Sequence, residues 1–419
     1  MNKTRNMMYA VLPTLVLAAM FPGVAKSADD VADLKQQVER LTKEVQALQS
    51  QVDERRTAAD RAETVAAPQS DSTDGTTSDP AVRTVPNAAV HLGGYGHVGL
   101  TDGRKDPIDQ SSFSTVGFNP IFHYQYKDLL LFETELEIEV NDEGEADFGL
   151  EYANMNFFVN DYVTVFGGKF LSPVGYFIQN LHPAWINKFP SKPPGFQEEA
   201  GAAPVSDVGI GIRGGFPLGK TKANYALYVG NGPRLELNAA GDEIESIVAT
   251  GATSNPSNRK LIGGRFGILP LPHLEVGISA ATSRVAVVDD ATGAAEPDRS
   301  YDVAGADFAY KWKAVDLRGE YIRSKVGDLA MSAAPAGGNW RTWYVQAAYR
   351  IPKTKWEPAL RLAEYTSPND DQSEKQQAIA VDYWFQPNIV SKISYEFNSG
   401  QAGTANDANR LFLQFAYGF

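Results

Sequence analysis

The feature that most constrains this chain is an alternation of apolar and polar residues that runs through residues 88–419. Near residues 129–141, for example, apolar side chains occupy one set of alternate positions and four glutamates occupy the other (Glu133, Glu135, Glu137 and Glu139). A period of two is typical of a β-strand, because successive side chains point to opposite faces. The segment is therefore predicted to be a chain of strands.

The alternating runs predict sixteen strands, at about 21 residues per strand and connection. A membrane-crossing strand of about ten residues with its turn has this length. The strands are predicted near 89–100, 113–126, 129–141, 147–160, 162–171, 206–217, 222–231, 258–268, 273–286, 300–313, 315–326, 339–351, 355–366, 376–386, 388–399 and 409–419.

The connections between these runs alternate in length. Short joins follow the even-numbered strands, as at Asn160-Asp161 and Lys313-Ala314, whereas long joins follow most odd-numbered strands, as at 172–206 and 232–257. Short turns at one end and long loops at the other are typical of an outer-membrane barrel, whose short turns are periplasmic. The fold class is therefore predicted as an all-β transmembrane, 16-stranded antiparallel outer-membrane β-barrel, preceded by an N-terminal coiled-coil helix.

The last strand supports this prediction. Alternate residues of 410–419 are apolar and the chain ends on Phe419, which resembles the assembly signal of bacterial outer-membrane barrels. The mature chain has no apolar run of about 18 residues, which argues against a spanning α-helix. The competing interpretation is a soluble, secreted array of β-sandwiches, which would not need its loops sorted by length.

Residues 1–27 are predicted to be a signal peptide. Lys3 and Arg5 form a basic start, residues 8–21 are apolar but too short to span a membrane, and small residues follow at Ala25 and Ser27. Cleavage is predicted after Ser27, with Ala25 as the alternative. A retained signal anchor is the competing interpretation.

Residues 28–56 carry a heptad pattern and are predicted to form a periplasmic coiled coil. Its seam is formed by Val31, Leu34, Val38, Leu41, Val45, Leu48 and Val52. The residues of the seam favour a coiled coil of two helices. The alternative is a single helix packed on the surface of its own domain. Residues 57–87 are rich in Ala, Ser, Thr, Asp and Pro and are predicted to be a flexible linker between the coil and the barrel domain, 88–419.

Strand parity assigns sides, because lipid requires the apolar face outward and charges inward. The four glutamates near 129–141 then face the interior, as do cations on other strands: Lys169, Arg213, Arg265, Arg318 and Arg361. A fully packed lumen would not hold so many charges unless they were paired. These residues are predicted to line a water-filled channel and set its selectivity. For any single arginine, the alternative is a wall residue paired with a neighbouring acid.

The connection at 172–206 is the longest and contains large apolar residues that an exposed loop would not favour. The chain here resembles sixteen-stranded outer-membrane porins, whose third loop folds into the barrel as the constriction. Among such porins, it more closely resembles the phosphate-selective porin O and P superfamily at Gly168-Lys169-Phe170-Leu171-Ser172-Pro173. The coiled coil resembles that of trimeric porins for dicarboxylates and other small organic anions, which implies a homotrimer.

The chain departs from the phosphate-selective pattern, because its arginines are dispersed and face a stripe of glutamates. In the third loop, Lys188 and Lys192 are offset by Glu198 and Glu199. The prediction is a weakly selective diffusion pore for small hydrophilic solutes, with a mild preference for anions such as small organic acids or phosphate.

Other classes fit less well. A net charge of −13 argues against nucleic acid, and the absence of cysteine excludes thiolate chemistry. The five histidines show no metal-binding spacing, so no catalytic residue, metal or cofactor is predicted. The expected partners are outer-membrane lipid and lipopolysaccharide, small solutes and further copies of the chain. The alternative function is an outer-membrane structural anchor or adhesin, whose coil contacts peptidoglycan or locks the trimer.

Overall fold

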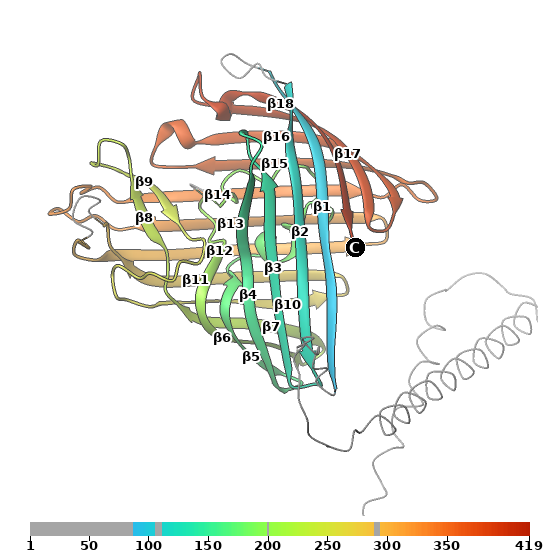
Figure 1. Cartoon of the computed structure of the whole chain (residues 1–419), viewed down its shortest axis with the longest axis horizontal. Helices are drawn as coiled ribbons and strands as arrows, with labels where there is room; N and C mark the ends of the chain where they lie inside the picture. The colour runs from blue at the N-terminus through green and yellow to red at the C-terminus, as the bar shows by residue number, and fades with distance from the viewer. Residues whose placement is uncertain (1–86, 105–110, 199–200, 289–293) are drawn as a thin grey trace, which may run out of the picture. The chain divides into compact units, whose positions relative to one another are not determined.

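The computed structural model describes residues 87–104, 111–198, 201–288 and 294–419. Within them, sixteen antiparallel strands close into a barrel in which β1 pairs with both β2 and β18 (Figure 1). The predicted number, order and approximate bounds of the barrel strands are confirmed. The predicted signal peptide, the coiled coil with its heptad residues and all but the last residue of the linker lie outside the described residues.

The barrel strands are β1 (Ala88–Arg104), β2 (Ser111–Tyr126), β3 (Leu130–Val140), β4 (Ala146–Asn160), β5 (Val163–Leu171), β6 (Ser206–Leu218), β7 (Thr221–Gly230), β10 (Leu261–Leu271), β11 (Leu274–Val285), β12 (Arg299–Trp312), β13 (Val315–Val326), β14 (Gly338–Tyr349), β15 (Trp356–Thr366), β16 (Glu374–Gln386), β17 (Ile389–Gly400) and β18 (Asn409–Gly418). The remaining elements are the hairpin β8 (Arg234–Leu237) and β9 (Ile244–Val248), the helix α2 (Phe177–Leu181) and the 3₁₀ turns η2 (Asp370–Gln372) and η3 (Ala405–Asp407).

Two local predictions are corrected. The join predicted at 269–272 is partly strand, because β10 continues to Leu271 through a register shift after Ile268. Pro270 lies within this irregularity, where its missing N–H costs no regular ladder bond. The connection predicted at 232–257 contains the β8–β9 hairpin, which is too short to give a clear alternation in the sequence.

The alternation of exposed and buried residues follows the strand parity. In β15, Leu360 and Leu362 are 59% and 52% exposed on the outer face, whereas Arg361 between them is 0% exposed. An apolar outer face is what a lipid-facing barrel requires. None of the helices in the described part of the chain is long and apolar enough to cross a membrane.

The end of the chain closes the barrel. The backbone N–H of Phe419 donates to the Gly94 carbonyl at 2.9 Å, and the Gly94 N–H donates to the Phe419 carbonyl at 3.1 Å. The Phe419 ring also stacks on Phe118 of β2, with 5.7 Å between the ring centroids. The terminal residue therefore belongs to the seam between the last strand and the first.

Candidate functional site

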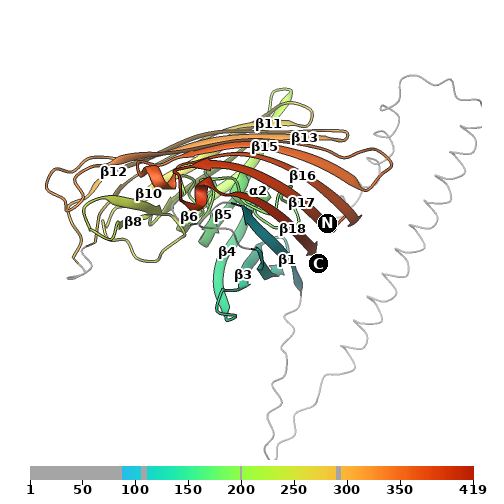
Figure 2. The ribbon, with the colours of Figure 1, turned by 90° about the horizontal axis from the view of Figure 1, so that it is seen from above.

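The described part of the β5–β6 loop, residues 172–198 and 201–205, lies inside the ring of strands (Figure 2). Its apolar side chains Phe177, Ile178, Leu181 and Phe196 are buried in one cluster with side chains of β5, β7 and β10–β15. The rings of Phe177 and Phe196 lie 5.6 and 5.3 Å from that of Tyr344 on β14. Since burying a large apolar side chain stabilises by about 1.5–3 kcal/mol, this cluster holds the loop against one wall.

The start of α2 is held by a buried acid on β13. The carboxylate of Glu320 accepts hydrogen bonds from the backbone N–H groups of Tyr176 at 3.1 Å and Phe177 at 2.8 Å. The preceding N–H, of Gly175, donates to Ser279 Oγ at 2.9 Å. These bonds satisfy donors at the helix start that lack a partner within the helix.

Gly175 allows this close approach, because its φ is +85° and a Cβ there would overlap the Glu320 carboxylate. We expect Gly175→Ala to lower the apparent melting temperature of the barrel in detergent. Gly219→Ala is the matched control, since Gly219 has φ +62° but no neighbour within 4 Å of its Cβ position. The control measures only the free-energy cost of placing alanine in a left-handed backbone conformation, about 1–2 kcal/mol. Equal losses in the two variants would contradict the overlap at Glu320.

Two inward cations also hold the loop. The guanidinium of Arg361 donates to the Ser191 carbonyl at 2.9 Å, to Gln376 at 2.8 Å and to Glu396 at 3.2 Å, and it lies 4.4 Å from the centre of the Phe189 ring. The ammonium of Lys392 donates to the carbonyls of Ala184 and Asn187. The sequence predicts Arg361 as a selectivity residue. In the structure its side chain is buried, and its hydrogen bonds go to the loop and to the neighbouring strands β16 and β17.

Three more of the predicted cations have acidic partners nearby. Arg265 pairs with Asp307 at 2.5 Å and with Glu275 at 2.9 Å. Arg318 pairs with Asp316 at 2.6 Å, and Lys188 of the loop pairs with Glu357 at 2.9 Å. Strand parity indicates which side chains face inward, but it does not indicate which of them neutralise one another.

The opposite side of the lumen retains open space in three adjoining cavities. A loop-side cavity of about 530 Å³ lies beneath the β8–β9 hairpin and includes Lys169 and Glu236 in its lining. A central cavity of about 510 Å³ is lined by β1–β4, β16–β18 and the β5–β6 loop. A turn-side cavity of about 420 Å³ is lined by β2–β7 and the loop, including Arg213 and Glu133.

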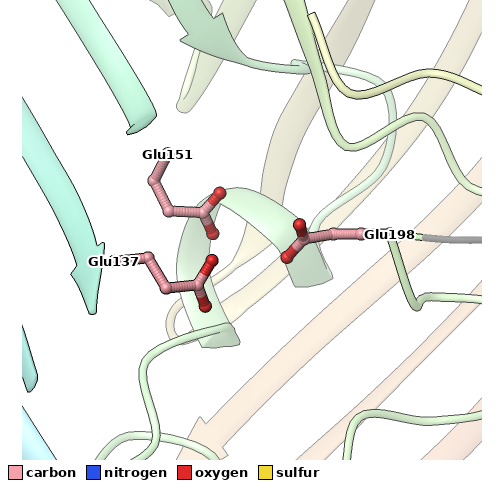
Figure 3. Close-up of side chains that lie close together, drawn as sticks. All are labelled: Glu137, Glu151 and Glu198. Atoms are coloured by element: carbon pink, nitrogen blue, oxygen red, sulfur yellow. The ribbon is translucent and has the colours of Figure 1, made fainter. Parts of the chain in front are cut away.

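Shared lining residues connect the three cavities. Glu137, Glu151 and Glu198 line both the loop-side and the central cavity, and His182 lines both the central and the turn-side cavity. Figure 3 shows the three carboxylates converging, and one oxygen from each lies within 4.8 Å of the others. We call these three glutamates the carboxylate junction.

Each glutamate of the junction reaches the lumen by a different route. Glu137 faces inward by the alternation of β3, and Glu198 is supplied by the β5–β6 loop. Glu151 faces inward because the β3–β4 register shifts, so that Tyr152 pairs with Glu135 and Leu150 with Leu136. The residue between them, Glu151, is the extra residue of a β-bulge, which redirects a side chain.

The bulge has a signal in the sequence that simple alternation missed. Phe148 and Leu150 face outward at even positions, whereas Met155 and Phe157 face outward at odd positions. The change of phase between them requires one extra residue in the strand. A second missed signal is a run of small inward residues on β14–β16, where Ala348, Ala359, Ala378 and Ala380 leave room for Phe189 of the loop.

Acidic side chains control the electrostatics around the junction. Lys192 pairs with Glu198 at 3.0 Å. Burial lowers the pKa of Lys192, but the charges of Glu198 and Glu151 outweigh this and hold the pKa above its ordinary value. Burial also lowers the pKa of His182, but the adjacent Glu135 carboxylate, 3.7 Å from Nε2, raises it by a larger amount. The pKa of His182 therefore lies above its ordinary value. Positive charge is therefore favoured at this level of the lumen.

The remaining predicted site residues contact the cavities directly. Lys169 donates to the Leu150 carbonyl at 2.6 Å, and Arg213 donates to Asn156 at 2.7 Å and lies 3.4 Å from Glu133. Glu139 lines the central cavity. Glu135 is buried and accepts a hydrogen bond from the Tyr95 hydroxyl at 2.8 Å. The structure thus brings the glutamate stripe together with Lys169, Lys192 and Arg213.

A closed barrel of sixteen antiparallel strands with the β5–β6 loop inside it is the porin fold. Similar solved structures include the anion-selective porin from Comamonas acidovorans, with 14% sequence identity, a TM-score of 0.53 and coverage of 79% of this chain and 100% of that chain. The outer membrane channel DcaP of Acinetobacter baumannii has 10% identity, a TM-score of 0.55 and coverage of 80% and 99%. OmpT, an outer membrane protein of Vibrio cholerae solved in a trimer form, has 12% identity, a TM-score of 0.51 and coverage of 79% and 99%.

These likenesses show the fold alone, because the sequence identities are low. No known family profile matches the sequence, and no curated protein matches it.

Proposed function

We propose that the protein is an outer-membrane porin through which small hydrophilic solutes diffuse passively. The observation that carries this proposal is the series of three cavities that share lining residues beside the β5–β6 loop. The loop packs against β10–β15, and the carboxylate junction lies where the loop-side and central cavities meet. Charged walls that are not fully paired are stable beside water and costly in a packed core.

The charges of the lumen do not support the anion preference expected from the sequence. Four predicted cations, Arg265, Arg318, Arg361 and Lys188, have acidic partners within 3.2 Å. The junction between cavities is formed by carboxylates, with Lys192 as the cation paired to it. We therefore propose that the constriction favours cations and that uncharged solutes are selected by size.

Uptake of uncharged sugars by proteoliposomes tests the channel separately from its selectivity. We expect swelling in a monosaccharide, slower swelling in a disaccharide and none in a large dextran, since the solute must pass the junction. Liposomes without protein are the control. The protein must first show the shift in gel mobility on heating, the heat-modified band, that marks a folded barrel. If liposomes with this folded protein swell no faster than the control, the result contradicts the channel. The structural-anchor function would then remain.

We also propose that the chain forms a homotrimer in the outer membrane, with residues 28–56 as a periplasmic clamp. The heptad pattern supports the coiled coil, and the trimer form of the similar Vibrio cholerae protein supports three copies. Deleting residues 28–87 is expected to leave a folded barrel but to lower the temperature at which the oligomer dissociates in detergent. A deletion variant whose oligomer is as heat-resistant as the parent would contradict the clamp.

A further inference from the structure

We propose that the central cavity binds a small organic cation with two primary ammonium groups, such as a short aliphatic diamine. This inference rests on the proposed channel and names the class of solute that the channel retains longest. Two independent features support it: the balance of charge on the cavity wall, and a set of buried acceptor atoms that have no donor among the described residues and belong to residues of the cavity wall.

Carboxylates outnumber cations on the wall of the central cavity. Its acidic residues are Glu137, Glu139, Glu151, Glu198, Glu374 and Glu396, and its basic residues, apart from histidine, are Lys192 and Arg410. Lys192 is paired with Glu198, and Arg410 donates to the Ala405 carbonyl at 2.9 Å. Within the described residues, Glu137 and Glu151 have no ion-pair partner. A cation entering the cavity would therefore meet more carboxyl groups than basic groups.

Three buried oxygen acceptors on the same wall lack a hydrogen-bond donor among the described residues. They are Asn119 Oδ1, Gln414 Oε1 and Glu374 Oε1, on residues that are 1%, 4% and 5% exposed. All three residues line the central cavity. A buried acceptor left without a donor costs about 1–3 kcal/mol, so such atoms favour a ligand that donates.

The chemistry of these groups selects an ammonium ion. An ammonium group supplies three donors together with a positive charge, whereas a carboxylate or phosphate would add acceptors to acceptors. The β2–β3 register places Asn119 beside Glu137 of the carboxylate junction, whereas Gln414 and Glu374 lie on β18 and β16. Acceptors that are spread over the wall in this way suit a ligand with a donor at each end. A single Ca²⁺ or Mg²⁺ ion instead needs several oxygens around one point, each at about 2.0–2.6 Å from the metal.

Lys192 shows that this environment stabilises an ammonium ion. Its pKa lies above the ordinary value despite burial, because Glu198 and Glu151 surround it. The approach is acidic as well, since Glu236 and Glu245 line the loop-side cavity along with Lys169. Acidic clefts raise the local concentration of cations and so favour their entry.

The test is calorimetric titration of the folded full-length protein with 1,4-diaminobutane and, separately, with butanedioate, which has the same chain length and the opposite charge. We expect saturable binding of the diamine and none of the dicarboxylate. Tighter binding of butanedioate would overturn the proposal. Equal binding of Mg²⁺ and the diamine would also overturn it, because that result indicates general charge screening.

Variants separate the two features of the site. Glu137→Gln combined with Glu151→Gln is expected to weaken diamine binding at least about tenfold, since each lost charge contact is worth about 1 kcal/mol or more. Asn119→Leu removes an unpaired acceptor without changing charge and is expected to weaken binding several-fold. Asp161→Asn, in the exposed β4–β5 turn, is the control with unchanged affinity. Unchanged affinity in both cavity variants, with the heat-modified band retained, would overturn the proposal.

A failure of the diamine site can be distinguished from a failure of the proposed channel function. Sugar uptake by the parent protein reports the channel, and the titration reports the cation site. A protein that takes up sugars but binds no diamine would overturn this inference alone.

Discussion

Replacing Arg361 by leucine is expected to lower the free energy of unfolding by about 3–5 kcal/mol, because it leaves the Glu396 carboxylate buried without its cation. It also removes the donor to the Ser191 carbonyl, so the β5–β6 loop should lose a point of attachment to the wall. The first effect is measured by denaturant unfolding in detergent. The second should appear as current fluctuations in single-channel recordings.

Two variants control this result. Arg361→Leu combined with Glu396→Leu removes both charges and is expected to recover part of the lost stability, since apolar replacement of a whole buried pair is often neutral. Arg323→Leu removes an exposed arginine of β13 and should change stability by less than about 0.5 kcal/mol. If the double variant were less stable than the parent by the sum of the losses of Arg361→Leu and Glu396→Leu measured separately, the pairing would not explain the effect.

Neutralising the carboxylate junction is expected to have the largest effect on selectivity. In the triple variant Glu137→Gln, Glu151→Gln and Glu198→Gln, Lys192 loses its partner and remains as the unpaired charge at the junction. Three opposing charges, each worth about 1 kcal/mol in water, correspond to at least a tenfold fall in the cation-to-anion permeability ratio. The reversal potential in a salt gradient measures this ratio.

The conductance of the triple variant is the internal control. The glutamines keep the size of the glutamates, so sugar uptake should stay close to that of the parent while the ion selectivity changes. Asp161→Asn should change neither. A triple variant that keeps the parent's reversal potential would show that the junction does not control ion passage.

The barrel was predictable from the sequence because strand parity in lipid is a strong constraint. Residues such as Leu360, Arg361 and Leu362 must alternate between lipid and lumen, and each does. The inward position of the β5–β6 loop was predictable for a similar reason, since Phe177 and Phe196 need an apolar surface. Both predictions follow from the environment that each type of side chain requires, lipid or an apolar core for apolar residues and the lumen for charged ones.

The partners of the inward charges could not be predicted in this way. Alternation assigns a face to Arg361, but its contacts with Ser191 and Glu396 depend on the path of a loop and on the register of distant strands. Glu151 was missed because a one-residue bulge reverses the parity of β4. The expected anion preference came from a resemblance to other porins, and local pairing of the arginines removes its physical basis.

The most direct test of the whole account is the conductance of the purified full-length protein in a planar bilayer with a salt gradient. The account predicts ohmic current steps in groups of three and a reversal potential shifted towards that of the cation. Absence of steps from correctly folded protein would contradict the channel. Steps with a reversal potential shifted towards that of the anion would contradict the proposed cation preference of the carboxylate junction.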